Sequence, residues 1–260
     1  MRLGRAKTGY NLPAMTKMQN RISELPDPAL TPDRERQMSR TELIQARLEA
    51  RYGVAEWRPR FEPVDELVAC ILSQHTSDLN SLRAFETLKR AYPDWETVIQ
   101  ASATDIADTI RRGGLANSKA VRIQQVLGKI LQSHGRISLE CLDSMTDAEA
   151  RSYLMELPGV GPKTAAIVLS FALGRPVMPV DTHIFRVAWR LGLIEKKIGE
   201  AKAHDALQAQ VKPENVYRFH VALIEHGRQV CKAPTPRCGE CPLTDICRYY
   251  QERVAPAATE

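Results

Sequence analysis

The amino-acid sequence predicts an all-α protein, and three observations support that prediction. Apolar residues recur at helical spacing from about residue 40 onward, capping residues stand before several of these runs, and no convincing period-2 run is flanked by hairpin turns. After Pro63, for example, apolar residues fall at i, i+3, i+4, i+7 and i+8. We therefore expect short helices joined by tight connections.

The expected helices begin at capping residues or prolines and end at glycines or apolar run ends. They run from Thr41 to near Gly53, from Pro63 to about Leu72, from the caps Thr76, Ser77 and Asp78 to about Leu88, from Trp95, from near Thr104 to Gly113, from Asn117 to Gly135, and from Thr146 to near Leu157. Thr146 and Glu149 have the spacing of a capping box. Within Asn117–Gly135, one apolar side is expected to carry Val121, Val126, Ile130 and Leu131.

The composition is that of an ordinary soluble protein. The chain has 260 residues, of which 43% are hydrophobic and 26% charged. No apolar run approaches the roughly 20 residues that span a bilayer, so no membrane association is expected. The net charge of +5 favours a polyanionic partner only slightly.

Residues 1–38 are predicted to form a basic, disordered extension, because they are polar, contain four prolines and show little periodicity. Met1–Asn20 carries four basic and no acidic residues, but lacks the continuous apolar stretch of a secretory signal. An organellar targeting segment shares this charge bias and is the alternative interpretation.

Four of the six cysteines fall within 17 residues near the C-terminus and are predicted to bind metal: Cys231, Cys238, Cys241 and Cys247. Four thiolates can hold either zinc or a [4Fe–4S] cluster, and the ligand set alone does not separate the two. Disulfides are a third interpretation, which the absence of a signal peptide disfavours. Cys70 and Cys141 stand alone in apolar helical patterns and are expected to be buried thiols.

The segment Leu157–Ala165 reads L-P-G-V-G-P-K-T-A and lies between two helical patterns. Gly159 and Gly161 flank Val160, which lets the chain turn sharply and approach another surface. The next helix then presents free N–H groups to a DNA phosphate without selecting a base. The alternative is a tight helix–helix connection in which the glycines serve geometry alone.

Lys163 and Asp181, 18 residues apart, are the candidate catalytic residues. A neutral amine can attack C1′ of a nucleotide and form a Schiff base, and a carboxylate can stabilise the developing cation. Asp181 is also expected to cap a helix that ends at Gly192, and Lys163 could be a solvated surface residue. His183 lacks any metal-ligand spacing, so a packed or hydrogen-bonded helix histidine is expected.

These segments resemble the endonuclease III family of helix-hairpin-helix DNA glycosylases. The resemblance rests on Leu157–Ala165 and on V-D-T-H-I-F-R-V at Val180–Val187, and it extends from about residue 40 to about 250. It implies that Lys163 is the nucleophile and Asp181 its partner. It also implies that the four C-terminal cysteines hold a structural [4Fe–4S] cluster.

The resemblance further implies the two-domain fold of these glycosylases. Residues 56–175 are expected to form a six-helix barrel, and residues 39–55 with 176–260 an iron–sulfur cluster domain. Damaged double-stranded DNA would lie across the cleft between them, with Lys163 and Asp181 on facing sides. A monomer is expected.

Two loops resemble the segments with which the family opens the duplex, where side chains fill the gap left by a flipped base. Leu115, after Gly113-Gly114, resembles the leucine wedge; the alternative is a loop leucine turned into the core. His75, preceded by Gln74, occupies the position where the family usually has a glutamine. Lys232 and Arg237 could contact phosphate, or could be solvated charges.

The sequence therefore predicts an intracellular, DNA-associated glycosylase and AP lyase that removes oxidised pyrimidines and cleaves by β-elimination through a lysine Schiff base. A mismatch adenine glycosylase is disfavoured, because Ala69 and Cys70 stand where that group has a catalytic glutamate. A mismatch thymine or uracil glycosylase and a non-catalytic DNA-binding module are the remaining alternatives.

Overall fold

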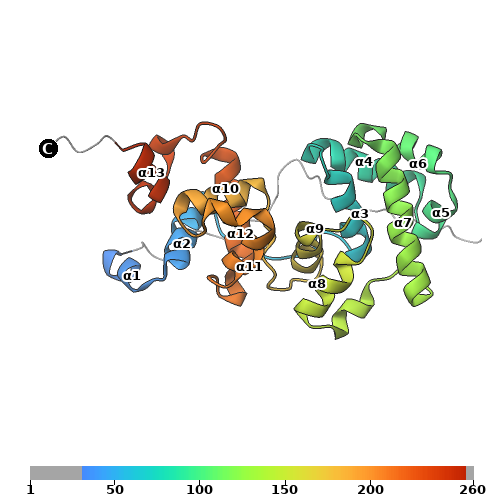
Figure 1. Cartoon of the computed structure of the whole chain (residues 1–260), viewed down its shortest axis with the longest axis horizontal. Coiled ribbons are helices and arrows are strands. Elements are labelled where there is room, and N and C mark those ends of the chain that lie inside the picture. The colour runs from blue at the N-terminus through green and yellow to red at the C-terminus, as the bar shows by residue number, and fades with distance from the viewer. Residues whose placement is uncertain (1–30, 256–260) are drawn as a thin grey trace, which may run out of the picture.

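The computed structural model describes residues 31–255, and all of their regular elements are helical (Figure 1). No helix in this part of the chain is long and apolar enough to cross a membrane. The α-helices are α1 (Pro32–Gln37), α2 (Arg40–Tyr52), α3 (Pro63–Ser73), α4 (Asp78–Ala91), α5 (Trp95–Gln100), α6 (Ala103–Thr109), α7 (Ala116–His134), α8 (Asp147–Met155), α9 (Pro162–Ile167), α10 (Thr182–Leu191), α11 (Gly199–Gln208), α12 (Val216–Gln229) and α13 (Arg248–Arg253).

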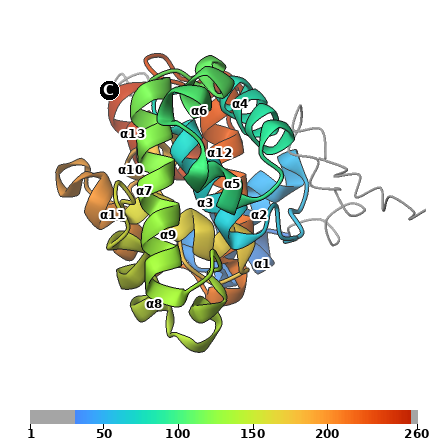
Figure 2. The same cartoon turned by 90° about the vertical axis from the view of Figure 1, so that its right-hand side faces the viewer.

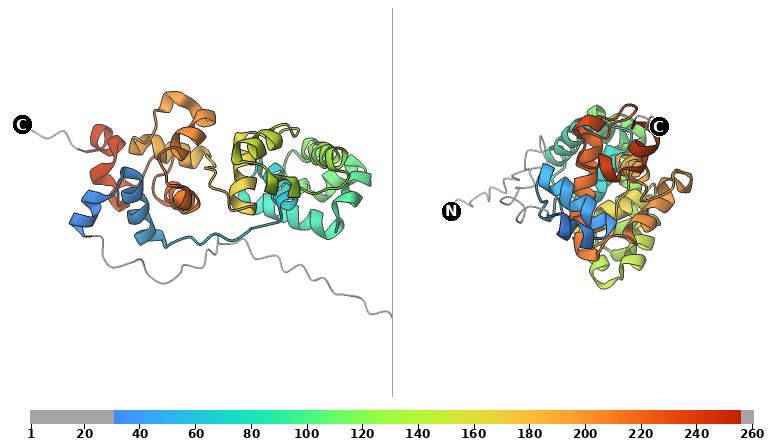
Figure 3. Two further views of the ribbon diagram at one scale, coloured as in Figure 1. Left: turned by 90° about the horizontal axis from the view of Figure 1, so that it is seen from below. Right: turned by 90° about the vertical axis from the view of Figure 1, so that its left-hand side faces the viewer.

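The helices form two lobes, each around its own hydrophobic core (Figure 1). The first core draws its buried residues from the continuous stretch Val64–Val177, with α3 packed against α4, α7 and α9. In Figure 2, α7 runs along the outer face of this lobe. The second core combines Ile44 and Leu48 of α2 with residues between Met178 and Leu243. The chain therefore crosses between the lobes twice, and Figure 3 shows the crossing from α2 to α3.

Local signals explain most helix boundaries. Thr146 and Glu149 form the predicted capping box at the start of α8, and Gly192 ends α10 in the left-handed conformation, both as predicted. Ser39, rather than Thr41, caps α2, and it forms a capping box with Glu42. The helix predicted to reach Gly113 ends at Thr109 and continues as a 3₁₀ turn over Arg111–Gly113. Val121 is 45% exposed, so its predicted place on the apolar side of α7 was wrong.

A π-helix over Val168–Ala172 continues α9, at a place where the sequence predicts no such element. Such i→i+5 turns are rare and occur often at functional sites. The Trp57 indole donates to the Ser170 carbonyl at 2.8 Å, and the Arg60 amide donates to the Phe171 carbonyl at 3.3 Å. The crossing chain between α2 and α3 is therefore fastened to this π-helix.

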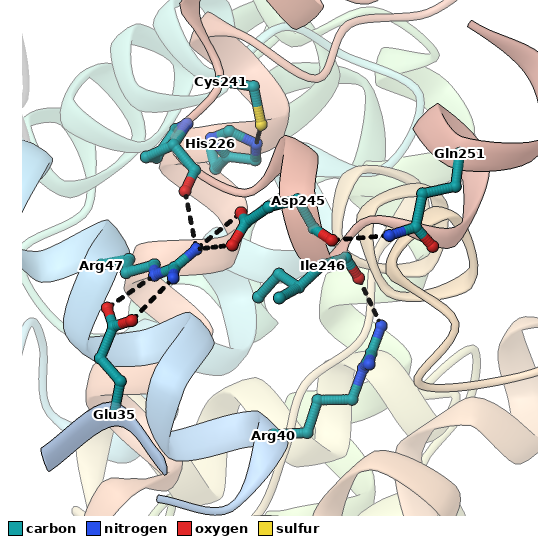
Figure 4. A network of polar contacts seen from close by, with 9 residues as sticks. Glu35, Arg40, Arg47, His226, Cys241, Asp245, Ile246 and Gln251 are labelled. Atoms are coloured by element: carbon teal, nitrogen blue, oxygen red, sulfur yellow. Dashed lines mark hydrogen bonds and ion pairs between the residues drawn. The ribbon is translucent and has the colours of Figure 1, made fainter. Parts of the chain in front are cut away.

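Two arginines join the first helices of the chain to its C-terminal loop (Figure 4). Arg47 donates to both carboxylate oxygens of Glu35 in α1 at 2.9 Å, and to Asp245 at 2.7 Å. Arg40 donates to the carbonyl oxygens of Leu191 and Ile246. Residues 1–30 of the predicted extension lie outside the described residues. Its last part is not structureless, because Pro32–Gln37 form α1.

Candidate active site and DNA-binding surface

Lys163 is the second residue of α9 and is exposed to solvent. Gly161 caps the helix and Pro162 occupies its first position, where an N–H has no intrahelical partner. Leu157 and Val160 are 3% and 6% exposed, so their side chains anchor the hairpin in the first core. Among the predicted DNA-contact residues, Val160 can therefore offer only its backbone to a ligand.

The backbone conformation at the apex of the hairpin favours glycine, and an arginine side chain packs against it. Gly159 has φ +72°, and a Cβ built there would lie 1.6 Å from Nη1 of Arg122. The Arg122 guanidinium, from α7, therefore rests directly against the hairpin. The Gln74 side chain donates to the Gly159 carbonyl at 3.3 Å, which joins its loop to the same hairpin.

Asp181 caps α10 from the second lobe, as predicted, and its Oδ1 accepts the Ile184 amide at 2.8 Å. Three side chains from α11 and α12 bond the backbone just before it. Gln208 accepts the Met178 amide at 3.0 Å, His204 Nδ1 lies 2.9 Å from the Met178 oxygen, and His220 Nδ1 lies 2.9 Å from the Pro179 oxygen. The cap is therefore held on both sides.

The elements that carry the two candidate catalytic residues meet at one buried histidine, His220. Burial lowers the pKa of His220 to about 4, while the nearby Asp181 charge opposes this and the Lys163 charge adds to it. The Phe171 ring packs edge-on against the imidazole, with the ring centroids 5.3 Å apart. Lys163, on the helix that continues to Phe171, and Asp181, two residues after Pro179, therefore belong to elements that meet at the junction between the lobes.

Leu115 and His75 stand on neighbouring loops of the first lobe. Leu115 is 59% exposed, as expected of a wedge residue and not of a core leucine. His75 is also exposed, and both residues have left-handed backbones, with φ near +50°. Such conformations are uncommon for residues other than glycine, and they persist only where other interactions compensate for the strain.

Lys119, which no sequence motif singles out, supplies that stabilisation. Its side chain is 4% exposed, and Nζ donates to the carbonyl oxygens of Leu72 and Gly113 at 2.7 Å and to Thr76 Oγ1 at 2.8 Å. All three ammonium protons are used, and both loops are tied to one cation. The sequence signal for a buried Lys119 is its position four residues before Ile123, on the buried face of α7.

The four C-terminal cysteines line one cavity of the second lobe. Arg190 Nη1 lies 3.4 Å from the Cys231 sulfur, and His226 Nε2 lies 3.5 Å from the Cys241 sulfur (Figure 4). Burial raises the pKa of Cys241 to about 11, which favours the protonated thiol. Within the described residues, no three His, Cys, Asp or Glu side chains are arranged to hold a single metal ion.

The remaining singled-out residues have ordinary surroundings. Cys70 is buried, as predicted, but Cys141 is only partly buried and its sulfur lies 3.5 Å from His134 Nε2. His183 is hydrogen-bonded to Arg186 at 3.1 Å, as expected. Arg237 lies 3.9 Å from Glu240 across the cysteine loop.

Comparisons with known proteins agree with this architecture. The family model of the HhH-GPD superfamily of base excision DNA repair proteins matches residues 68–213. Endonuclease III of Rickettsia conorii is 39% identical over 184 residues, covering 71% of this chain and 83% of that protein. The chain belongs to the endonuclease III family. A protein of Arabidopsis thaliana that is named as a DNA glycosylase is 36% identical over 190 residues, covering 69% of this chain and 64% of that protein.

A solved endonuclease III structure also superposes on this family member. It is described as a trapped endonuclease III–DNA covalent intermediate in an estranged-adenine complex. The TM-score is 0.71 at 28% identity, and the match covers 84% of this chain and 100% of the other. The all-α helix-hairpin-helix glycosylase fold predicted from the sequence is thereby confirmed.

Replacement of Lys119 by Met should loosen the two loops that carry His75 and Leu115. Three acceptors would lose their donor, which costs about 1–3 kcal/mol of unfolding free energy for each poorly compensated group. Urea unfolding would measure the loss, with Lys129→Met on the same helix as control. Equal stability of the two variants would show that Lys119 does not tie the loops.

The buried histidines should make the protein less stable in mild acid. Burial lowers the pKa of His204 and His220 below the ordinary value of 6.5, to about 4 for His220. Between pH 6.5 and 4 the unfolded chain therefore binds more protons, and the free energy of unfolding falls as the pH falls. Urea unfolding from pH 7 to 4.5 would measure this slope.

The variant His220→Phe cannot take up a proton and should show a shallower slope over the same pH range. His134→Phe, at an exposed site of the first lobe, should leave the slope as in the wild type. A His220→Phe slope equal to that of the wild type would contradict the assignment of acid sensitivity to His220.

Proposed function

We propose that this endonuclease III family member is a bifunctional DNA glycosylase and AP lyase of base excision repair. The observation that carries the proposal is the pair of Lys163, exposed at the start of α9, and Asp181, capping α10 in the other lobe, on elements that both contact the buried His220. A module that only binds DNA needs neither residue. The proposed substrates are oxidised or ring-saturated pyrimidines in duplex DNA.

The proposed reaction begins when the neutral Lys163 amine attacks C1′ of the damaged nucleotide. The glycosidic bond breaks, and the base leaves with the bonding electron pair and a proton. The sugar ring then opens and the C1′–nitrogen bond becomes a Schiff base. Loss of a proton from C2′ expels the 3′ phosphate, and hydrolysis of the imine returns free Lys163.

Asp181 would stabilise positive charge on the sugar and take part in the proton transfers. Its carboxylate is only half-buried, and one oxygen already accepts the Ile184 amide, so the other is available to the substrate. The backbone of Gly159, Val160 and Gly161 would bind a phosphate of the DNA strand, with Arg122 beside it. Leu115, Gln74 and His75 would enter the duplex from the neighbouring loops.

The two hydrophobic cores support the proposed domain division. Residues 56–175 would be the barrel domain, and residues 39–55 with 176–260 the cluster domain, with DNA bound across the junction. The last residue of the first core is Val177. The second core contains Ile44 and Leu48 and then residues from Met178 onward, so the proposed boundaries lie within a few residues of the change of core.

Cys231, Cys238, Cys241 and Cys247 would hold a [4Fe–4S] cluster. In a tetrahedral zinc site, Zn–S bonds of about 2.3 Å bring the sulfurs to about 3.8 Å from one another. A cluster instead binds each thiolate to a different iron, so the sulfurs surround a larger group. The four cysteines line one cavity, and the family resemblance favours the cluster as its occupant. The cluster would stabilise the C-terminal loop.

Lys163→Ala should abolish covalent chemistry and leave DNA binding within about threefold, because the exposed side chain anchors nothing in the fold. The wild type, this variant and the exposed-lysine control Lys202→Ala would be incubated with a thymine glycol duplex, with and without borohydride. Borohydride reduces the Schiff base to a stable adduct that runs slowly on a denaturing gel.

An adduct and a strand cut in the wild type and in Lys202→Ala, but not in Lys163→Ala, would support the proposal. Strand cleavage by clean Lys163→Ala protein would contradict it. A parallel G·T mismatch duplex tests the thymine glycosylase alternative, for which the unusual His75 is the favouring observation. Trapping only on a pre-formed abasic site would retain the lyase and remove the proposed base preference.

Cluster content gives an independent check. Wild-type protein purified without oxygen should contain about four irons and four acid-labile sulfides per chain. Cys238→Ser should lower both, whereas Cys141→Ser, outside the cavity, should keep them. One zinc per chain without labile sulfide would contradict the cluster assignment.

A further inference from the structure

We propose that His220 is a positioning residue for the reaction, holding the backbone before Asp181 so that its carboxylate faces the substrate. This inference rests on the proposed function. It adds a residue of α12 that contacts the backbone segment just before Asp181.

The chain before Asp181 depends on side chains for its hydrogen bonds. Within residues 31–255, no backbone–backbone hydrogen bond involves Met178, Pro179 or Val180. Their polar groups bond instead to Gln208, His204 and His220, at 2.9 to 3.2 Å. This extended segment is therefore placed by α11 and α12, and not by a sheet or a helix of its own.

The His220 contact has one possible polarity. The Pro179 carbonyl can only accept, so Nδ1 of His220 carries the proton and donates it. His204 Nδ1 is less determined, because it lies 2.9 Å from the Met178 carbonyl and 3.2 Å from the Val180 amide, and one nitrogen cannot serve both. His220 therefore gives the sharper test.

Few contacts separate His220 from Asp181, so loss of the His220 hydrogen bond should act directly on the placement of the Asp181 carboxylate. The imidazole is 4% exposed, and the Phe171 and Pro179 contacts fix its ring on two sides. Pro179 is two residues before Asp181, and Asp181 is pinned on the other side by the Ile184 amide. Loss of the His220 bond would release one of the two restraints on the cap. Misplacement by about 1 Å can cost on the order of 100-fold in rate.

Two substitutions separate positioning from other roles. Asparagine can place an N–H near the Nδ1 position of histidine, whereas glutamine places its amide near Nε2. His220→Gln should lower the single-turnover rate of Schiff-base formation by about 10- to 100-fold, with the Kd for the same duplex within about threefold. His220→Asn should recover most of the rate. His134→Gln, at an exposed site of the first lobe, should have the same rate and Kd as the wild type.

The experiment uses the full chain with its metal content measured, a pre-formed abasic duplex for trapping, and anisotropy for Kd. A double-mutant cycle adds a readout that general destabilisation would not produce. If His220 acts through Asp181, adding His220→Gln to the Asp181→Asn variant should lower the single-turnover rate by less than about threefold.

The outcomes for the two proposals are distinct. No trapping by the wild type would reject the proposed function itself. With wild-type trapping intact, equally slow Asn and Gln variants would overturn the positioning role, as would additive losses in the double variant. A rate unchanged in a folded His220→Gln protein would overturn it as well.

Discussion

The edge-on packing of Phe171 against Tyr217 and His220 joins the two hydrophobic cores, and the geometry of the proposed active site depends on that junction. Phe171 belongs to the π-helix that continues α9, so Lys163 and Phe171 stand on one unbroken helical rod. Tyr217 and His220 belong to α12, which packs against α10 behind Asp181. A shift of α12 relative to α9 would therefore change the separation of the nucleophile and the carboxylate. Because each residue is fixed to a different core, the reaction geometry is a property of the interface.

The sequence predicted best what is decided locally. The capping box of Thr146 and Glu149, the Asp181 cap and the exposed Leu115 follow from residues within a few positions of one another. The roles of Lys119 and His220 were missed because most of their partners are distant in sequence: Leu72 and Thr76 lie 47 and 43 residues from Lys119, and Pro179 lies 41 residues from His220. Each stands on an otherwise apolar helical face, beside Ile123 and Leu223 respectively, so a polar residue out of pattern was visible although its partner was not. The π-helix had no local signal that we recognised.

The residues around the proposed site fall into an exposed group and a buried group with different roles. Lys163, His75 and Leu115, which would meet DNA, are exposed, whereas Lys119, His204 and His220, which fix the surrounding loops, are buried. A buried polar group is costly unless its hydrogen bonds are made, so each of these three disfavours any arrangement in which its hydrogen-bond partner moves away. The left-handed backbones at His75 and Leu115 persist beside such a group. Stabilising energy from the interior thus maintains strained, solvent-facing loops at the surface that would open the duplex.

The two arginines that fasten α1 and α2 to the C-terminal loop have a consequence for biosynthesis. The first core is a continuous stretch of chain, so it can close while the ribosome is still translating the second half. The second core needs Ile44 and Leu48 from the beginning and Leu243 from the end. Until Asp245 and Ile246 have left the exit tunnel, Arg47 and Arg40 lack their C-terminal partners, so the N-terminal helices must wait. The second core, which includes the helix that Asp181 caps, is therefore completed after the first.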